Sequence, residues 1–86
     1  GNYPNPFNPE TNIRYSLKND GQVSIKIYNV KGELVKTLVN TSQNKGNYQV
    51  RWDGKDNLNN SVSSGIYFYR MQSGSYSEQK KMLLLK

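Results

Sequence analysis

The sequence predicts an all-β fold, arranged as an antiparallel β-sandwich, from three observations. Short segments in which apolar and polar residues alternate recur at roughly 8–12-residue spacing, which is typical of sandwiches. The 86 residues include seven Tyr, two Phe and one Trp, and aromatic residues favour strands. Gly, Asn and Asp gather between these segments, where they favour turns, and no segment shows helical periodicity of useful length.

Alternation in the first half of the chain assigns one face of each strand to the core. The residues expected to face inward there are Ile13, Tyr15, Leu17, Val23, Ile25 and Ile27. Residues 33–39 have some helical spacing, but the segment is short and follows the turn signal Lys31-Gly32. A strand is therefore predicted there as well.

Aromatic residues dominate the second half of the predicted core. Trp52 is the largest side chain in the sequence and is expected at the centre of the core. The other residues expected to face inward are Tyr48, Val50, Tyr67, Tyr69 and Met71. Ile66 and Phe68 are then expected to be only partly covered.

The predicted strands number about seven. They span residues 12–18, 22–29, 33–39, 47–53, 66–71 and 76–85, with a very short edge strand that begins at Val62. The polar residues 40–46 are expected to form a turn-like connection between two sheets. This pattern predicts an immunoglobulin-like antiparallel β-sandwich.

The chain is expected to be a single domain because it has only 86 residues. Residues 1–11 form a Pro-rich, extended entry segment that Tyr3 and Phe7 are expected to pin to the domain, and residues 12–86 form the sandwich. A Pro-rich linker with incidental aromatic residues is the alternative for the entry segment. The domain is expected to be a piece of a larger secreted protein.

Composition argues against an enzyme and against a nucleic-acid partner. The chain has no His and no Cys, so the usual nucleophile and general-base arrangements cannot be built, and no catalytic residue or cofactor is expected. The net charge is +6, but the Lys and Arg residues are spread along the chain without a block of like charge.

Two other binding chemistries remain open. Asp53 and Asp56 lie in an Asp/Asn-rich loop and are candidate calcium ligands, although the spacing misses the known calcium-loop pattern and a solvated turn is the alternative. Exposed aromatic residues can stack on sugars or single-stranded nucleic acid, which is one interpretation of Tyr15, Tyr48, Tyr67 and Tyr69. Their period of two along the strands favours core positions.

The end of the sequence carries its most unusual segment. A Lys pair and a final Lys flank four apolar residues, and such a run is expected either as a buried last strand or as a segment that another protein binds. It is far too short to span a membrane, so no membrane insertion is expected. The residues are Lys80, Lys81, Met82, Leu83, Leu84, Leu85 and Lys86.

An ordered set of motifs covers essentially the whole chain. It comprises Tyr-Pro-Asn-Pro-Phe-Asn-Pro at 3–9, Ile-Tyr-Asn at 27–29 before Lys31-Gly32, Gly-Asn-Tyr at 46–48, Trp-Asp-Gly at 52–54, Ser-Gly-Ile-Tyr at 64–67 with Tyr69, and the tail at 81–86. With this set the chain resembles the type A C-terminal sorting domain of the type IX (Por) secretion system. The immunoglobulin-like domain of the flagellar hook-capping protein is a related family that shares the Trp-Asp-Gly and Gly-x-Tyr parts.

The resemblance implies a non-catalytic secretion signal. Such a domain directs an N-terminal passenger from the periplasm through the outer-membrane translocon, with a shuttle protein and a sortase that removes the domain or attaches the passenger to the surface. The protein would then be secreted or displayed on the cell surface. The resemblance implies that the tail is the contact surface and that further motif positions have structural roles. Those family positions are Pro4, Pro6, Gly46, Tyr48, Gly65 and Tyr67. Trp52 and Tyr69 are expected to have structural roles as well.

Two alternatives belong to other functional classes. The domain is either a structural or adhesive immunoglobulin-like module of a multidomain protein, or a carbohydrate-binding module. A planar row of exposed aromatic residues would favour the carbohydrate-binding module.

Overall fold

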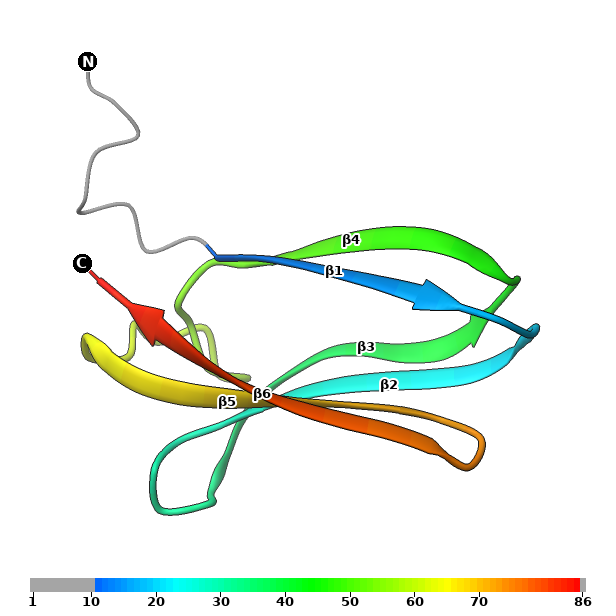
Figure 1. Cartoon of the computed structure of the whole chain (residues 1–86). Helices are drawn as coiled ribbons and strands as arrows, with labels where there is room; N and C mark the ends of the chain where they lie inside the picture. Colours follow the sequence, from blue (N-terminus) through cyan, green and yellow to red (C-terminus); the bar gives the residue numbers. More distant parts are fainter. Residues whose placement is uncertain (1–10, 86) are drawn as a thin grey trace.

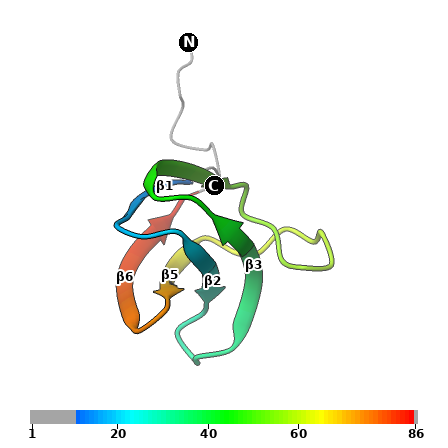
Figure 2. The same cartoon turned by 90° about the vertical axis from the view of Figure 1, so that its right-hand side faces the viewer.

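The protein forms two antiparallel sheets that pack face to face, as a computed structural model of residues 11–85 shows (Figure 1). The six strands are β1 (Thr11–Leu17), β2 (Gly21–Tyr28), β3 (Leu34–Gln43), β4 (Gly46–Trp52), β5 (Gly65–Ser73) and β6 (Tyr76–Leu84). The smaller sheet pairs β1 with β4, and the larger has the order β3-β2-β5-β6. Viewed along the strands, the larger sheet curls beneath the smaller one (Figure 2). The all-β sandwich is therefore confirmed.

The core lies between the sheets and consists of the alternating residues that the sequence predicts. Val23, Ile25 and Ile27 of β2 are fully buried, as is Trp52 at the end of β4. Tyr15, Tyr67 and Met71 are also buried, and the half-buried Tyr48 and Tyr69 pack against this cluster. The prediction that the tyrosines are core residues is therefore confirmed for Tyr15 and Tyr67, whereas Tyr48 and Tyr69 lie at the border of the core.

The predicted seventh strand is wrong. Around Val62 the structure has one isolated bridge, between Lys55 and Ser61, and the Val62 N–H donates to the Gly54 carbonyl at 3.0 Å. These contacts tie the segment to its own loop, and no strand is formed there among the described residues. The described part of the chain has six strands.

The expected turn over residues 40–46 is also partly wrong. Residues 40–43 continue β3, with Asn40 opposite Ser24 and Ser42 opposite Gln22. The Gln22 side-chain amide donates to Asn40 Oδ1 at 2.9 Å, so polar contacts extend the pairing where apolar alternation has ended. The crossing between sheets occurs, as expected, but it needs only Asn44 and Lys45.

The Asn29–Glu33 turn connects β2 to β3, as the sequence predicts. The Asn29 carbonyl accepts a hydrogen bond from the Gly32 N–H, and Asn29 Oδ1 accepts from the N–H groups of Lys31 and Glu33.

No helix in the described part of the chain is long and apolar enough to cross a membrane.

Candidate functional site

β6 is the strand that carries most of the predicted recognition residues. Among the described strands it pairs only with β5, so one of its edges presents unpaired backbone groups. The two-residue turn at Gly74 and Ser75 sets the register of this hairpin, with Ser73 opposite Tyr76 and Gly65 opposite Leu84. Among the described strands, β6 is therefore an edge strand of the larger sheet.

Strand alternation divides the predicted recognition residues between two faces of the larger sheet. Lys80, Met82 and Leu84 lie on the inner face, and Leu84 is only 1% exposed. Lys81 and Leu83 lie on the outer face, where Leu83 is 58% exposed. Sequence reasoning treated these residues as one segment, but Leu84 is a core residue.

The remaining tail residues differ in what the structure describes. Leu85 follows the end of β6 and is half-exposed, whereas Lys86 lies outside the described residues. Pro4, Pro6 and the whole predicted entry segment up to residue 10 also lie outside them.

A small charged cluster occupies the inner face of β6 beyond the edge of the smaller sheet. Lys80 Nζ lies 3.4 Å from Glu78 Oε2, and both groups are near Tyr69 on β5. Burial raises the pKa of the Tyr69 phenol above its ordinary value. The Lys80 charge lowers this pKa and the Glu78 charge raises it, but both effects are smaller than that of burial. The pKa of Lys80 is also raised, first by Tyr69 and then by Glu78.

The aromatic motif residues form the packed end of the core. The Trp52 indole N–H donates to the Lys55 carbonyl at 2.9 Å, and its ring meets the Tyr67 ring edge-on with centroids 5.1 Å apart. The Tyr67 hydroxyl donates to the Ser63 carbonyl at 2.7 Å. These contacts explain the Trp-Asp-Gly and Gly-Ile-Tyr motifs as structural.

Tyr48 has a similar structural role at the other end of the smaller sheet. Its ring stacks on Tyr15 of the neighbouring strand with centroids 5.4 Å apart, and its hydroxyl donates to the Asn44 carbonyl. The backbone dihedral φ is +148° at Gly46 and +151° at Gly65, the first residues of β4 and β5. Residues other than glycine rarely adopt this backbone conformation, which explains why both motif positions are glycine.

The Asp/Asn-rich loop uses its carboxylates to hold its own backbone. Asp56 Oδ1 accepts from the N–H groups of Leu58 and Asn60, both at 2.9 Å, and Asp53 Oδ1 accepts from the Lys55 N–H at 3.2 Å. Within residues 11–85 no group of three or more acidic, His or Cys side chains gathers where a metal could bind. The geometry therefore supports the turn interpretation of Asp53 and Asp56.

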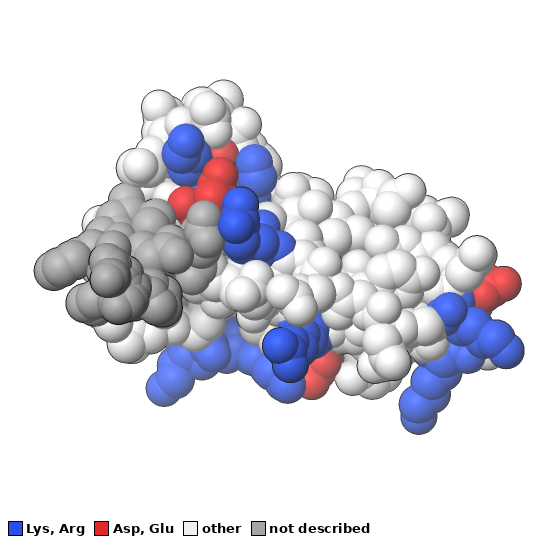
Figure 3. Space-filling model, turned by 90° about the horizontal axis from the view of Figure 1, so that it is seen from above, with Lys and Arg blue, Asp and Glu red and all other residues white. Residues whose placement is uncertain are grey.

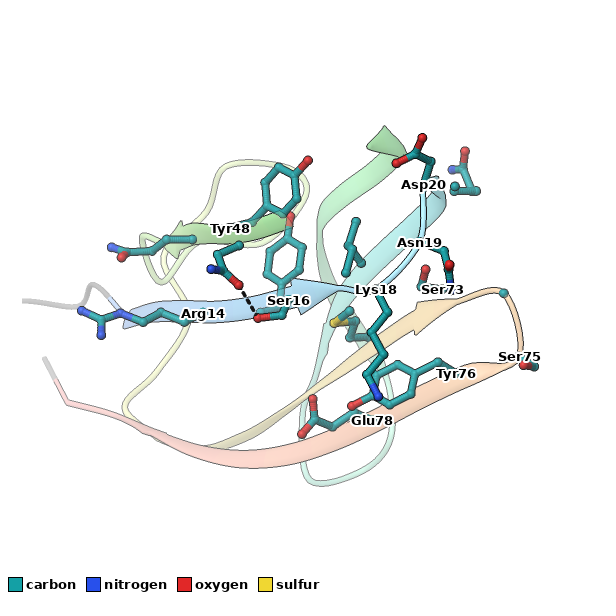
Figure 4. Close-up of a pocket in the computed structure, with 18 residues that line it drawn as sticks. Arg14, Ser16, Lys18, Asn19, Asp20, Tyr48, Ser73, Ser75, Tyr76 and Glu78 are labelled. Carbon is teal, nitrogen blue, oxygen red and sulfur yellow. Dashed lines mark hydrogen bonds between the residues drawn. The ribbon is translucent and has the colours of Figure 1, made fainter. Parts of the chain in front are cut away.

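A groove opens between the smaller sheet and the β5–β6 hairpin, with a volume of about 1100 Å³ (Figure 4). Lys18 reaches from the end of β1 toward β6, where Tyr76 and Glu78 lie. Tyr76 is 53% exposed and is the one highly exposed aromatic side chain among the described residues. The described surface thus lacks the planar aromatic row that would favour a carbohydrate-binding module.

Basic side chains occur in separate groups over the smaller sheet, with only a few acidic groups beside them (Figure 3). Arg14 and Arg51 extend from the two strands of this sheet. The described residues of this face form no continuous basic stripe of the kind that follows a nucleic-acid backbone.

A protein-family model described as the FlgD Ig-like domain matches residues 8–77, which is most of the chain. The chain belongs to this family. The match ends at Ser77, so most of β6 in this FlgD Ig-like domain lies beyond the matched segment. No curated protein matches the sequence.

Two solved structures share the fold of this FlgD Ig-like domain. FlgD from P. aeruginosa has a TM-score of 0.68 and 24% identity over 87% of this chain and 60% of the FlgD chain. Dimeric latent PorU from Porphyromonas gingivalis has a TM-score of 0.68 and 22% identity over 96% of this chain and 9% of the PorU chain. The domain thus corresponds to only part of each of these proteins.

Sequence reasoning did not include several residues that lie beside the exposed side chains of β6. β5 places Ile66 opposite Leu83, and Phe68 opposite Lys81. The tight turn at 74–75 would have given this pairing, because a two-residue hairpin fixes the register of both strands.

Proposed function

We propose that this FlgD Ig-like domain is a non-catalytic sorting module that directs a passenger protein across the outer membrane through the type IX secretion system. One observation carries the proposal. The end of β6 presents cationic and apolar side chains on a free sheet edge, and this segment lies beyond the part of the chain that the FlgD Ig-like family model matches.

The physical basis is recognition of a folded edge. A receptor can add a strand to β6 through the backbone and distinguish it by side chains at alternate positions. Lys81 then orients the domain against carboxylates, while Leu83 enters an apolar pocket. The translocon, its shuttle protein and the sortase are the proposed partners, and the proposed destination is the cell surface or the medium.

The fold likeness to PorU is compatible with this role. The similarity covers 96% of this chain but only 9% of the PorU chain. At 22% identity this likeness concerns the fold alone.

A structural immunoglobulin-like module is the second candidate. The family match and the similarity to FlgD favour it, because both rest on the sandwich rather than on the tail. In that case the exposed end of β6 has no receptor, and its side chains serve only solubility and packing.

An export assay separates the two candidates. The domain is fused to the C-terminus of a periplasm-targeted fluorescent reporter in a bacterium with an active type IX system, and reporter is quantified at the surface and in the medium. The expected result is export of the fusion and periplasmic retention of the reporter alone. A sorting domain of the host serves as the positive control.

The tail variant must keep the core intact. Deletion of residues 83–86 removes the buried Leu84, so its effect on export is confounded by unfolding. The double substitution Lys81→Gln and Leu83→Ser changes only outer-face side chains and leaves Leu84 in place. Retention of both the wild-type fusion and this variant, while the host domain is exported, would leave the structural module as the function.

A further inference from the structure

The outer face of the larger sheet carries a row of side chains that is apolar on β3, β2 and β5 and ends at a lysine on β6. The register places Leu34, Tyr28, Phe68 and Lys81 side by side, from β3 through β2 and β5 to β6. Directly opposite residues on neighbouring strands point to the same face and touch. Ile66 and Leu83 form an adjacent pair at the β6 side of this row.

These side chains are accessible although they are apolar. Leu34 is 49% exposed, Ile66 is 44% exposed and Leu83 is 58% exposed. Tyr28 and Phe68 are half-buried between them. Contiguous apolar surface of this kind on a small soluble domain marks an interaction site more often than scattered single residues do.

Three cations adjoin this apolar surface. Lys26 and Arg70 are directly paired across β2 and β5, and Lys81 lies in the next row. Like charges placed directly opposite each other destabilise a sheet. The Arg70 guanidinium lies 5.1 Å from the centre of the Tyr28 ring and donates to Gln79 Oε1 at 3.3 Å, so it is held against the apolar row.

No carboxylate faces outward from the paired positions of this sheet in the described residues. The Glu78 side chain of β6 lies on the inner face and pairs with Lys80, and Glu33 belongs to the turn that precedes β3. At the paired positions of the outer face, the charged side chains beside the apolar centre are therefore all cationic, and the Glu33 carboxylate lies only in the turn at the Leu34 end. The complement of this face has an apolar centre and a rim of carboxylates.

The shape of the face favours a protein over a lipid surface. Tyr28 and Phe68, the two aromatic side chains of this face, are half-buried and not among the exposed large side chains that a membrane-inserting surface presents. An apolar centre with a charged rim, including Arg and aromatic residues, is the composition of a protein interface.

We propose that the outer face of the β3-β2-β5-β6 sheet, defined by Tyr28, Ile66, Phe68, Arg70, Lys81 and Leu83, docks a protein whose matching surface has an apolar centre bordered by carboxylates. This rests on the proposed function, because it identifies the surface by which the export machinery recognises the domain. The recognition site is then a composite of three strands, and β6 supplies only its outward residues.

The test uses two matched pairs of variants in the reporter fusion. Ile66→Ser removes apolar surface from the outer face, and Leu58→Ser makes a comparable change in the remote loop, where Leu58 is 81% exposed. Arg70→Glu reverses a charge on the outer face, and Arg14→Glu does so on the smaller sheet. Trp52 fluorescence during urea denaturation verifies that each variant is folded.

The expected result is an about tenfold loss of exported reporter for Ile66→Ser and Arg70→Glu, the size associated with removal of one interface anchor. The Leu58→Ser and Arg14→Glu fusions should be exported at a level within about twofold of wild type, since both residues lie outside the outer face of the larger sheet. If wild type is exported and folded Ile66→Ser and Arg70→Glu are exported equally well, the composite surface is overturned while the sorting function stands. If the wild-type fusion is retained while the host domain is exported, both the composite surface and the sorting function are overturned.

A binding experiment distinguishes a protein partner from a lipid. The purified domain is co-sedimented with outer-membrane vesicles from the type IX-competent strain and with protein-free vesicles made from lipids of the same membrane. We expect binding to the first that protease treatment of the vesicles abolishes and that Arg70→Glu weakens about tenfold. Equal binding to the protein-free vesicles would overturn the assignment of a protein partner.

Discussion

The two faces of the larger sheet use similar side chains for different purposes. The inner face has Val23, Ile25 and Ile27 fully buried against the smaller sheet. The outer face has Tyr28, Ile66 and Leu83, which are equally apolar but remain partly in water. Apolar content alone therefore does not reveal a residue's role in this domain, because the face of the sheet to which each side chain points decides it.

The largest effect is expected where the inner face meets the smaller sheet. Trp52→Ala removes a fully buried indole together with its contacts to Tyr67 and Lys55. The expected loss of unfolding free energy is about 3–5 kcal/mol, which is enough to unfold a domain of this size. Circular dichroism during urea denaturation measures it, since the variant lacks the only Trp. A cooperative transition at the wild-type midpoint would contradict this role for Trp52.

Neighbouring leucines of β6 test the comparison most directly. Leu84→Ala opens a cavity in the core and should cost about 2–4 kcal/mol of unfolding free energy. Leu83→Ala truncates an outer-face side chain and should change it by less than about 0.5 kcal/mol. Urea denaturation followed by Trp52 fluorescence measures both variants. Equal losses would show that the two faces are packed alike.

A backbone effect of intermediate size is expected at the start of β5. Gly65→Ala adds a methyl group that meets no atom within 4 Å, so packing is unaffected. The cost comes from φ of +151°, which alanine rarely adopts, and should be about 1–2 kcal/mol. The same urea titration measures it, and Gly46→Ala at φ +148° provides a matched case. An unchanged midpoint would mean that the strand start tolerates another conformation.

The smallest effect concerns the charged cluster on the inner face. The raised pKa of Tyr69 means that the folded state retains this proton to higher pH than the unfolded state does, and the raised pKa of Lys80 acts in the same direction. Stability from both groups is therefore full below about pH 10 and declines as the pH rises through their folded values. Midpoints of urea denaturation between pH 8 and pH 11 should decrease, and Tyr69→Phe should flatten the decrease. A wild-type curve that stays level would contradict both shifts.

Periodicity predicted most of the sandwich because one face of each strand is buried. The bounds of β1, β2 and β4 agree with the prediction to within about one residue, since alternation of the kind seen at Ile13, Tyr15 and Leu17 leaves one register that buries them. Trp52 as the centre of the core followed from its size. The second half of β3 was missed because Asn40 and Ser42 pair through polar contacts that no apolar pattern reveals.

The candidate site was predicted less completely, for a physical reason. Residues 82–85 are all apolar, so the tail has no alternation from which its two faces could be separated. Only pairing with β5 shows that Leu84 completes the core while Leu83 faces water. Ile66 and Arg70 join this surface through the register of three strands, which is a property of the fold and not of any one segment.

The position of β6 in the chain has a consequence for when the domain matures. β6 is the last strand of the domain to be synthesised, yet its Leu84 fills the core and its backbone covers the edge of β5. A nascent chain that ends before residue 76 leaves β5 as an open edge, and one that ends before residue 84 leaves the core without the Leu84 side chain. Folding of the preceding strands therefore requires that β6 has been synthesised, because small domains fold as cooperative units. The outer face is then displayed only on chains in which β6 has been synthesised, so a receptor that binds it selects folded domains over domains that lack this strand.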